Sequence, residues 1–160
     1  MRPLQDVPVA EVVTTYLELT DPAGIRPARR SVEPRRISPP DGAINRRFYL
    51  AVGAAHQWND HRDKDEHWWQ AHAGEVETWV LAPDAGYYEL HRVGDDVEIA
   101  YFGLLPAFQG RGLGGALLAH ALRRGFELGS RVWVHTCTLD GPHALANYEA
   151  RGLERYRVDR

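Results

Sequence analysis

The chain has 160 residues, of which 44% are hydrophobic and 26% charged, and its formal net charge at pH 7 is −3. This length and apolar content fit one domain over residues 1–160 with a core of its own. The charge gives no overall attraction to nucleic acid, and no apolar run approaches the roughly 20 residues of a membrane span. Because there is one cysteine and no apolar leader at the start, we expect a soluble cytoplasmic protein without disulfides.

Apolar periodicity and turn residues predict the elements in chain order. Residues 14–19 alternate and favour a strand, and a proline-containing, arginine-rich segment that follows is expected to be a solvated loop. Two helices are then expected, and three antiparallel strands after them. The remaining elements alternate between helix and strand, so an α/β fold is expected. The expected ranges are 14–19, 45–52, 64–73, three strands within 75–105, 112–128, 131–139, 142–151 and 153–159.

Residues 98–122 combine an apolar strand, a proline, a glycine-rich loop and an apolar helix. Glycines at the start of a helix let a phosphate approach its unpaired backbone N–H groups. Gly110, Gly112 and Gly115 match a dinucleotide signature, but too little chain follows for the remaining βα units of that fold. A P-loop needs a lysine after its last glycine, and the only lysine is Lys64. A phosphorylated cofactor of a third kind is therefore expected.

The run Gln109-Gly-Arg-Gly-Leu-Gly114 resembles the Q/R-x-x-G-x-G/A pyrophosphate motif of the GNAT superfamily of acyl-CoA-dependent N-acyltransferases. The run from Asn147 to Leu153 is similar to the family's Tyr-x-x-x-Gly-Phe element, and residues 134–152 resemble a group of small bacterial acyltransferases. The resemblance covers the second half of the chain and is weaker before it. It implies a GNAT-like mixed, mostly antiparallel central sheet of about six strands flanked by helices.

The resemblance also implies acetyl-CoA, or another acyl-CoA, as the donor substrate, without a metal. Backbone N–H groups of the glycine loop would hold the pyrophosphate. Backbone groups at the end of the preceding strand would polarise the thioester carbonyl and align the pantetheine arm. The predicted cofactor-binding residues are Leu104, Leu105, Gln109, Gly110, Arg111, Gly112, Leu113, Gly114, Gly115 and Asn147.

Three residues are candidates for proton transfer. Tyr148 lies where family members place a proton donor to the CoA sulfur, although a tyrosine there could also only pack against the sheet. Glu98 is a carboxylate in an apolar strand, 11 residues before Gln109, the spacing at which one branch of the family has its general base. A structural role for Glu98 is the alternative. His135 is either a second choice of base or a satisfied core histidine.

Together these features predict an N-acyltransferase that moves an acyl group, foremost acetyl, from CoA to the amine of a small polar molecule. Cys137 is expected to be buried and inert, so the amine would attack directly in a ternary complex. An arginine and an aspartate beside tryptophans suggest a zwitterionic acceptor. The spacing of the histidines and carboxylates in residues 56–72 suits no metal. The predicted acceptor-binding residues are Trp58, Asp60, Arg62, Trp68, Tyr101 and His135.

Two other functions stay open. A non-catalytic CoA-sensing module would keep the glycine loop, but Glu98 and Tyr148 argue against it. Alternatively, an acyl chain could come from a carrier protein docked by the arginines of residues 26–36. The complete pyrophosphate motif argues against this donor, because a carrier-bound pantetheine brings no pyrophosphate to the loop. The family usually has one more strand than is predicted before Arg160, so we expect a more open cleft or one completed in a homodimer.

Overall fold

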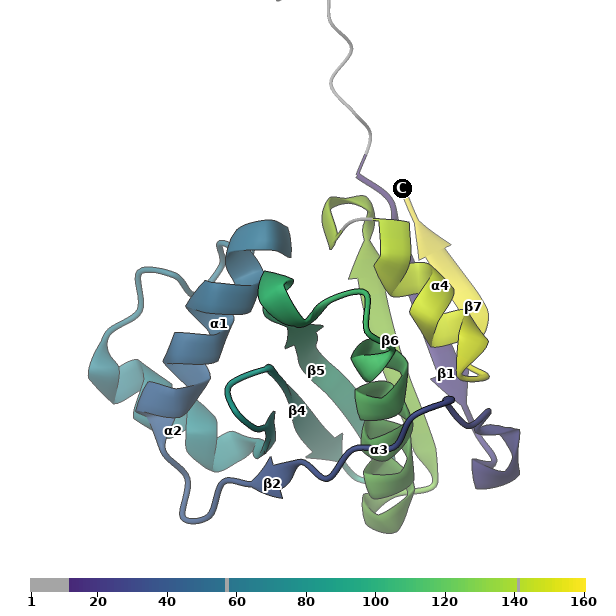
Figure 1. Cartoon of the computed structure of the whole chain (residues 1–160), viewed down its shortest axis with the longest axis horizontal. Coiled ribbons are helices and arrows are strands. Elements are labelled where there is room, and N and C mark those ends of the chain that lie inside the picture. The colour runs from purple at the N-terminus through teal and green to yellow at the C-terminus, as the bar shows by residue number, and fades with distance from the viewer. Residues whose placement is uncertain (1–11, 57, 141) are drawn as a thin grey trace, which may run out of the picture.

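The protein, seen here as a computed structural model, is described for residues 12–56, 58–140 and 142–160 (Figure 1). Seven strands of these residues form one sheet in the order β2-β3-β4-β5-β6-β1-β7. β5 and β6 are parallel, and every other neighbouring pair is antiparallel. The predicted mixed, mostly antiparallel sheet is confirmed, with one strand more than expected. The strands are β1 (Thr14–Leu19), β2 (Arg35–Arg36), β3 (Glu77–Leu81), β4 (Gly86–Val93), β5 (Asp96–Leu104), β6 (Arg131–Cys137) and β7 (Glu154–Asp159).

The four predicted helices are present and cover the two faces of the sheet. α1 and α2 lie over one face, where Phe48 and Val52 of α1 pack on Tyr87 of β4. α3 and α4 lie over the other face, where the neighbouring Tyr88 joins the main core (Figure 1). Tyr87 and Tyr88 point to opposite faces because side chains alternate along a strand. The helices are α1 (Gly42–His56), α2 (Glu66–Glu75), α3 (Leu113–Leu128) and α4 (Pro142–Ala150).

The helix α3 anchors the glycine loop that precedes it. Leu117, Leu118, Ala121 and Leu122 are all fully buried in the main core, as expected of this apolar helix. Burial of one leucine side chain contributes about 1.5–3 kcal/mol. The start of α3 is therefore held in a fixed position against the sheet.

The strand β1 lies inside the sheet, between β6 and β7. Tyr16 is paired with His135 of β6 and with Arg157 of β7, both antiparallel. Leu17 and Leu19 fill the main core from this strand. The position beside β6 is thus occupied by the beginning of the described chain. As a result, Tyr16 shares a face of the sheet with His135.

A β-bulge sets the direction of two side chains on β5. Glu89 of β4 is opposite Tyr101, but the next residue pairs with Ile99, so Ala100 is the extra residue of the bulge. Glu98 is opposite His91, two residues beyond Glu89 on β4. Glu98 and Tyr101 therefore face the same side of the sheet although they are three residues apart.

A buried ion pair joins α2 to the centre of the sheet. Glu89 is fully buried, and its Oε1 lies 2.5 Å from Nε2 of His72 on α2. The other carboxylate oxygen has no hydrogen-bond partner among the described residues. Burial by itself lowers the pKa of His72, but the hydrogen bond and the charge of Glu89 outweigh burial and raise that pKa. The imidazolium is the form that this pocket stabilises.

We predict that His72→Gln costs about 3–5 kcal/mol of unfolding free energy at pH 5.5, because it leaves a buried carboxylate without its charged partner. Because folding raises the pKa of His72, its charge stabilises the fold fully below the unfolded value of about 6.5. This stabilisation is lost as the pH rises through the folded value, so the cost should be smaller at pH 8.5. Urea denaturation at both pH values measures the difference. His67→Gln, exposed on the same helix, is the control. A cost independent of pH would contradict the ion pair.

Candidate active site

One cavity of about 1000 Å³ lies where β5 and β6 separate. The two strands pair only over Asp96–Glu98 and Arg131–Trp133, and beyond these residues β6 continues beside β1. Residues of both faces of the sheet line the cavity, including Tyr148 on the α4 side and Tyr16 on the opposite side. The cavity thus has two approaches, one from each face. Its volume suits a small-molecule site.

The predicted glycine loop lines the α3 side of this cavity. Gly110 and Gly112 both have φ of 77°, a left-handed conformation that glycine adopts without strain. Gly112 is the N-cap of α3 and provides no side chain, and the N–H of Ala116 is bonded to the Gly112 carbonyl at 3.5 Å. The N–H groups of the first helical turn are left for an anion. Gln109 supports the loop, since its Nε2 donates to the Leu104 carbonyl at 3.3 Å.

Two arginines beside the loop were not predicted as site residues. Arg30 Nη1 donates to the Arg111 carbonyl at 2.8 Å, and the Arg30 side chain passes directly over Gly112. The guanidinium of Arg151 lies beside Gly115. The segment that carries Arg30 crosses over the start of α3 (Figure 1). In the sequence this arginine could not be distinguished from its exposed neighbours, because its position depends on a contact between residues 81 apart.

The end of β5 provides one free backbone amide. The Leu105 N–H donates to the Ala85 carbonyl at 2.9 Å, so it points towards β4 and away from the cavity. Because backbone groups alternate in direction along a strand, the Leu104 N–H points towards the gap between β5 and β6. Leu104 lines the cavity, whereas Leu105 packs in the smaller apolar cluster under α1. The geometry therefore brings only the first of these two amides to the site.

Asn147 and Tyr148 reach the cavity from α4. The side-chain amide of Asn147 lies beside Gly114 of the glycine loop, and both residues line the cavity. Tyr148 is 6% exposed and packs edge-on against Phe102, with ring centroids 6.2 Å apart. Burial, and to a lesser degree the charge of Asp140, raises the pKa of the Tyr148 phenol. The phenol remains protonated at neutral pH and can therefore donate a hydrogen bond or a proton.

Glu98 and His135, the two candidate bases, face each other across the gap. Glu98 Oε1 lies 3.8 Å from His135 Nε2, and the side chains are 22% and 47% exposed. His135 is therefore not a core histidine, and Glu98 is only partly buried. The Tyr16 ring lies 5.5 Å from the His135 ring. All three side chains line the cavity on the face opposite α3.

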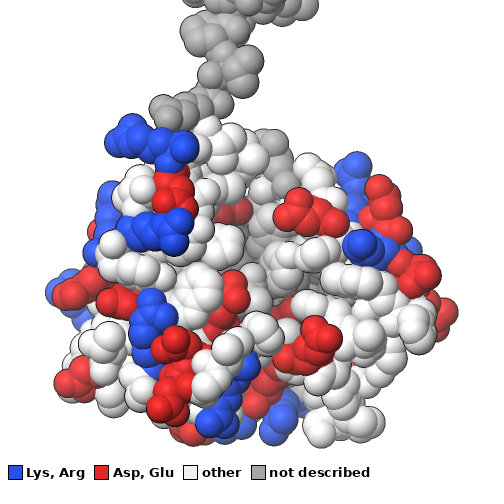
Figure 2. All heavy atoms as spheres, turned by 180° about the vertical axis from the view of Figure 1, so that it is seen from behind, with Lys and Arg blue, Asp and Glu red and all other residues white. Residues whose placement is uncertain are grey.

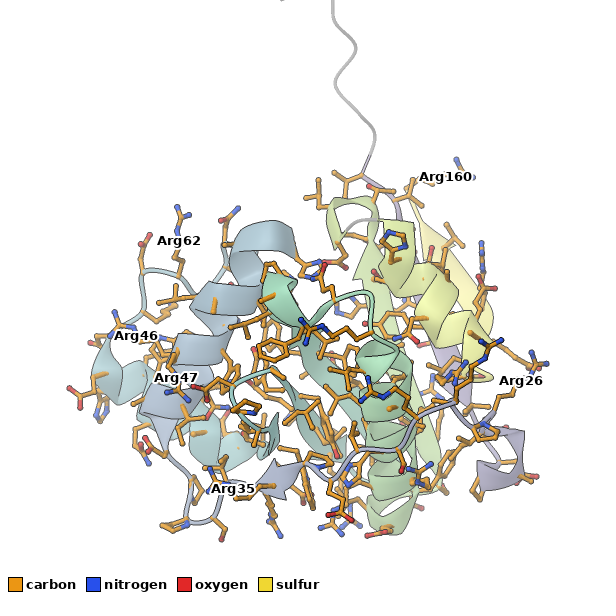
Figure 3. All side chains as sticks on the ribbon, viewed as in Figure 1. Arg26, Arg35, Arg46, Arg47, Arg62 and Arg160 are labelled. Carbon is orange, nitrogen blue, oxygen red and sulfur yellow. The ribbon has the colours of Figure 1, made fainter. Side chains whose placement is uncertain are left out.

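Four of the six predicted acceptor residues line the cavity: Trp58, Asp60, Tyr101 and His135. The other two do not. Trp68 packs on Trp69 and His72 of α2, with its ring stacked on the imidazole at 5.1 Å. Arg62 is exposed, and its side chain points away from the molecule (Figure 3). Spacing along a loop cannot distinguish such residues from lining ones.

Asp140, which the sequence analysis did not single out, closes one end of the cavity. Its carboxylate accepts hydrogen bonds from Trp58 Nε1 at 3.2 Å, Thr136 Oγ1 at 2.7 Å and the Cys137 N–H at 2.9 Å. Its carbonyl oxygen lies 2.6 Å from Nδ1 of His56, at the end of α1. Asp140 thus ties β6 to the α1 side of the molecule. Its sequence context contains no signal for this role.

No group of three or more His, Cys, Asp or Glu side chains in the described part of the chain could hold a metal ion. No helix among the same residues is long and apolar enough to cross a membrane.

Comparisons with solved structures show proteins of the same fold. A GCN5-related N-acetyltransferase from Sphaerobacter thermophilus has a TM-score of 0.64 and 17% identity, over 92% of this chain and 49% of that one. Another from Kribbella flavida has a TM-score of 0.63 and 16% identity, over 91% and 55%. An aminoglycoside acetyltransferase from an uncultured soil metagenomic sample, in complex with sisomicin, has 0.63 and 14%, over 74% and 86%. At these identities the likeness shows the fold alone.

The chain spans about half the length of the first two of these structures. A search of the curated proteins finds no match. A model of the acetyltransferase (GNAT) family matches residues 43–153, well over half of the chain. The matched region contains the glycine loop, Glu98, His135 and Tyr148. The chain therefore belongs to the GNAT family of acetyltransferases.

Proposed function

We propose that the protein is an N-acyltransferase that moves an acetyl group from CoA to an amine of a small polar molecule by direct attack. The observation that supports this proposal is the cavity between β5 and β6. It joins the glycine loop on one face of the sheet to Glu98 and His135 on the other. The aminoglycoside acetyltransferase of the same fold supports a small-molecule acceptor.

The residues present fit acetyl-CoA. The N–H groups at the start of α3 and the Arg30 guanidinium would hold the pyrophosphate, because charge-assisted hydrogen bonds are the strong ones. The Leu104 N–H would donate to the thioester carbonyl, and Asn147 would bond to the pantetheine amides. When bound, acetyl-CoA supplies an activated acyl group with a thiolate leaving group.

The acceptor amine must be neutral to attack. For an alkylamine with a pKa of about 10.4, deprotonation at pH 7 costs about 4.6 kcal/mol. Glu98 is placed to accept that proton, and His135 at 3.8 Å can pass it to solvent. The pair thus provides a route for the proton on the face from which the amine arrives.

The departing thiolate needs a proton or a hydrogen bond. Tyr148 is a buried proton donor that lines the cavity, and its raised pKa keeps the proton on the phenol until the thiolate forms. Cys137, which was expected to be buried, is only partly buried and lines the cavity. Direct attack by the amine, without an acyl-cysteine intermediate, remains the proposal.

We predict that CoA raises the melting temperature, and that Gly112→Asp abolishes the shift by placing a negative side chain where phosphate binds. Arg30→Ala should weaken CoA binding about tenfold through loss of a charge-assisted hydrogen bond. Thermal denaturation measures the shift, and calorimetric titration measures the affinity. Arg26→Ala is the matched control, since this side chain points away from the molecule (Figure 3). A pantetheine shift equal to that of CoA would contradict the phosphate site and favour a carrier-bound donor.

We predict that Tyr148→Phe lowers kcat by about 10² to 10⁴ while the Kd for CoA changes little, because only the proton donor is removed. A single-turnover assay separates the chemical step from product release. The ring still packs against Phe102, so the melting temperature should change little. An unchanged single-turnover rate would exclude Tyr148 from proton transfer.

We predict that Glu98→Gln lowers kcat/KM for an alkylamine at pH 7, and that the deficit shrinks as the pH approaches the pKa of the amine. The reason is that a neutral amine no longer needs a base. With a weakly basic acceptor such as an aniline the loss should be small. Rates of thiol release across pH 6.5–10 test this. The same deficit at every pH and with both acceptors would assign Glu98 to the fold.

A further inference from the structure

Apart from three histidines, the ionisable side chains that line the cavity are mainly carboxylates. Among the described lining residues there are three carboxylates, Asp60, Glu98 and Asp140, and neither arginine nor lysine. The surface of the molecule seen from behind is of mixed charge, with acidic and basic side chains interspersed (Figure 2). A cleft lined by one sign of charge attracts ligands of the opposite sign.

Two of the three carboxylates are available to a ligand. Asp140 uses both oxygens within the protein, so it contributes a fixed charge rather than a contact. Glu98 faces only His135, at 3.8 Å. Asp60 is exposed at the rim and forms no ion pair with any other described residue. A ligand with two separate positive charges could therefore meet both Glu98 and Asp60.

Aromatic rings line the wall between these carboxylates. The rings of Trp58 and Tyr101 lie 5.0 Å apart, and those of Tyr49 and Tyr101 lie 5.3 Å apart. Tyr16 adds a ring on the β1 side. Aromatic faces attract cations and accept an alkyl chain without a desolvation cost. The wall suits an aliphatic cation.

No arginine or lysine among the described lining residues can receive an acceptor carboxylate. Arg62, which motivated the expectation of a zwitterionic acceptor, points away from the molecule (Figure 3). Arg30 lies at the glycine loop, and Arg131 is paired with Glu18 and Asp96. A carboxylate brought beside Glu98, Asp60 and Asp140 would meet like charges, which costs affinity.

We propose that the acceptor is an aliphatic amine with a second positive charge and no carboxylate, of the diamine or polyamine class. This inference rests on the proposed function and names its substrate class. One ammonium group gives a proton to Glu98, and its nitrogen forms a bond to the acetyl carbon. The C–S bond then breaks, the Tyr148 phenol protonates the sulfur, and the remaining excess proton on that nitrogen restores the phenol. The second ammonium group stays charged beside Asp60.

The test compares 1,5-diaminopentane with lysine and lysinamide as acceptors, with acetyl-CoA as donor. Lysine is 1,5-diaminopentane with a carboxylate on one terminal carbon, and lysinamide replaces that charge by a neutral amide. We expect kcat/KM for the diamine to exceed that for lysine at least about tenfold, and lysinamide to recover most of the difference. Thiol release at low ionic strength measures all three.

Variants at the rim test the role of Asp60. Asp60→Asn should reduce the preference for the diamine over lysine at least about threefold, mainly through KM for the diamine. Arg62→Ala is the matched control and should leave the preference unchanged, because its side chain points away (Figure 3). An unchanged preference in Asp60→Asn would overturn the assignment of the second charge.

The outcomes separate this inference from the proposed function. If lysine is acetylated as fast as the diamine or faster, the proposed substrate class is wrong, but the proposal of N-acyl transfer is unaffected. If none of the amines is acetylated although CoA binds, N-acyl transfer to small amines fails. Tryptophan fluorescence of the CoA complex then decides the substrate class. Tighter binding of the diamine than of lysine supports it, and equal binding overturns it.

Discussion

The separation of β5 from β6 is the constraint on which the site depends. A parallel pair that ends after three residues leaves backbone N–H and C=O groups without a strand partner, and such groups must be satisfied. Here β4 pairs with the far edge of β5 and β1 pairs with the far edge of β6, so the edges that face the gap are the ones without a strand. A ligand with its own amide groups can complete the hydrogen bonding of both edges. The site is therefore the part of the sheet where β5 and β6 do not pair with each other.

The sequence predicts the features that depend on neighbouring residues. The buried stripes of α3, the glycines before it and the alternation of residues 14–19 each act within a few positions, and each is found where it was expected. The glycine loop could be identified because its function requires backbone conformations that few residues adopt. Tyr148 was predicted from the resemblance of residues 147–153 to a family motif, and its side chain lines the cavity.

The remaining features depend on contacts that spacing does not encode. The bulge at Ala100 turns Tyr101 to the face of Glu98, and it exists only through the register with β4. The place of β1 between β6 and β7, the approach of Arg30 to the loop and the closure by Asp140 all join distant segments. Arg62 and Trp68 were predicted to bind the acceptor, but neither side chain lines the cavity. The composition of their loop suggested a role at the site. Trp68 instead packs on α2, and Arg62 points away from the molecule (Figure 3).

The interior position of β1 has a consequence for the order of assembly. The Val13 N–H donates a hydrogen bond to Thr138, 125 residues later. The beginning of the described chain therefore cannot pair in the sheet until residues near 138 are present. Contacts of such long range are slow to form, because the entropy of closing the loop precedes any gain from pairing. During synthesis on the ribosome, α1, α2 and the β3–β5 meander can form early. The wall that carries Tyr16 is completed last, so an incomplete chain has a cofactor loop before it has an acceptor pocket.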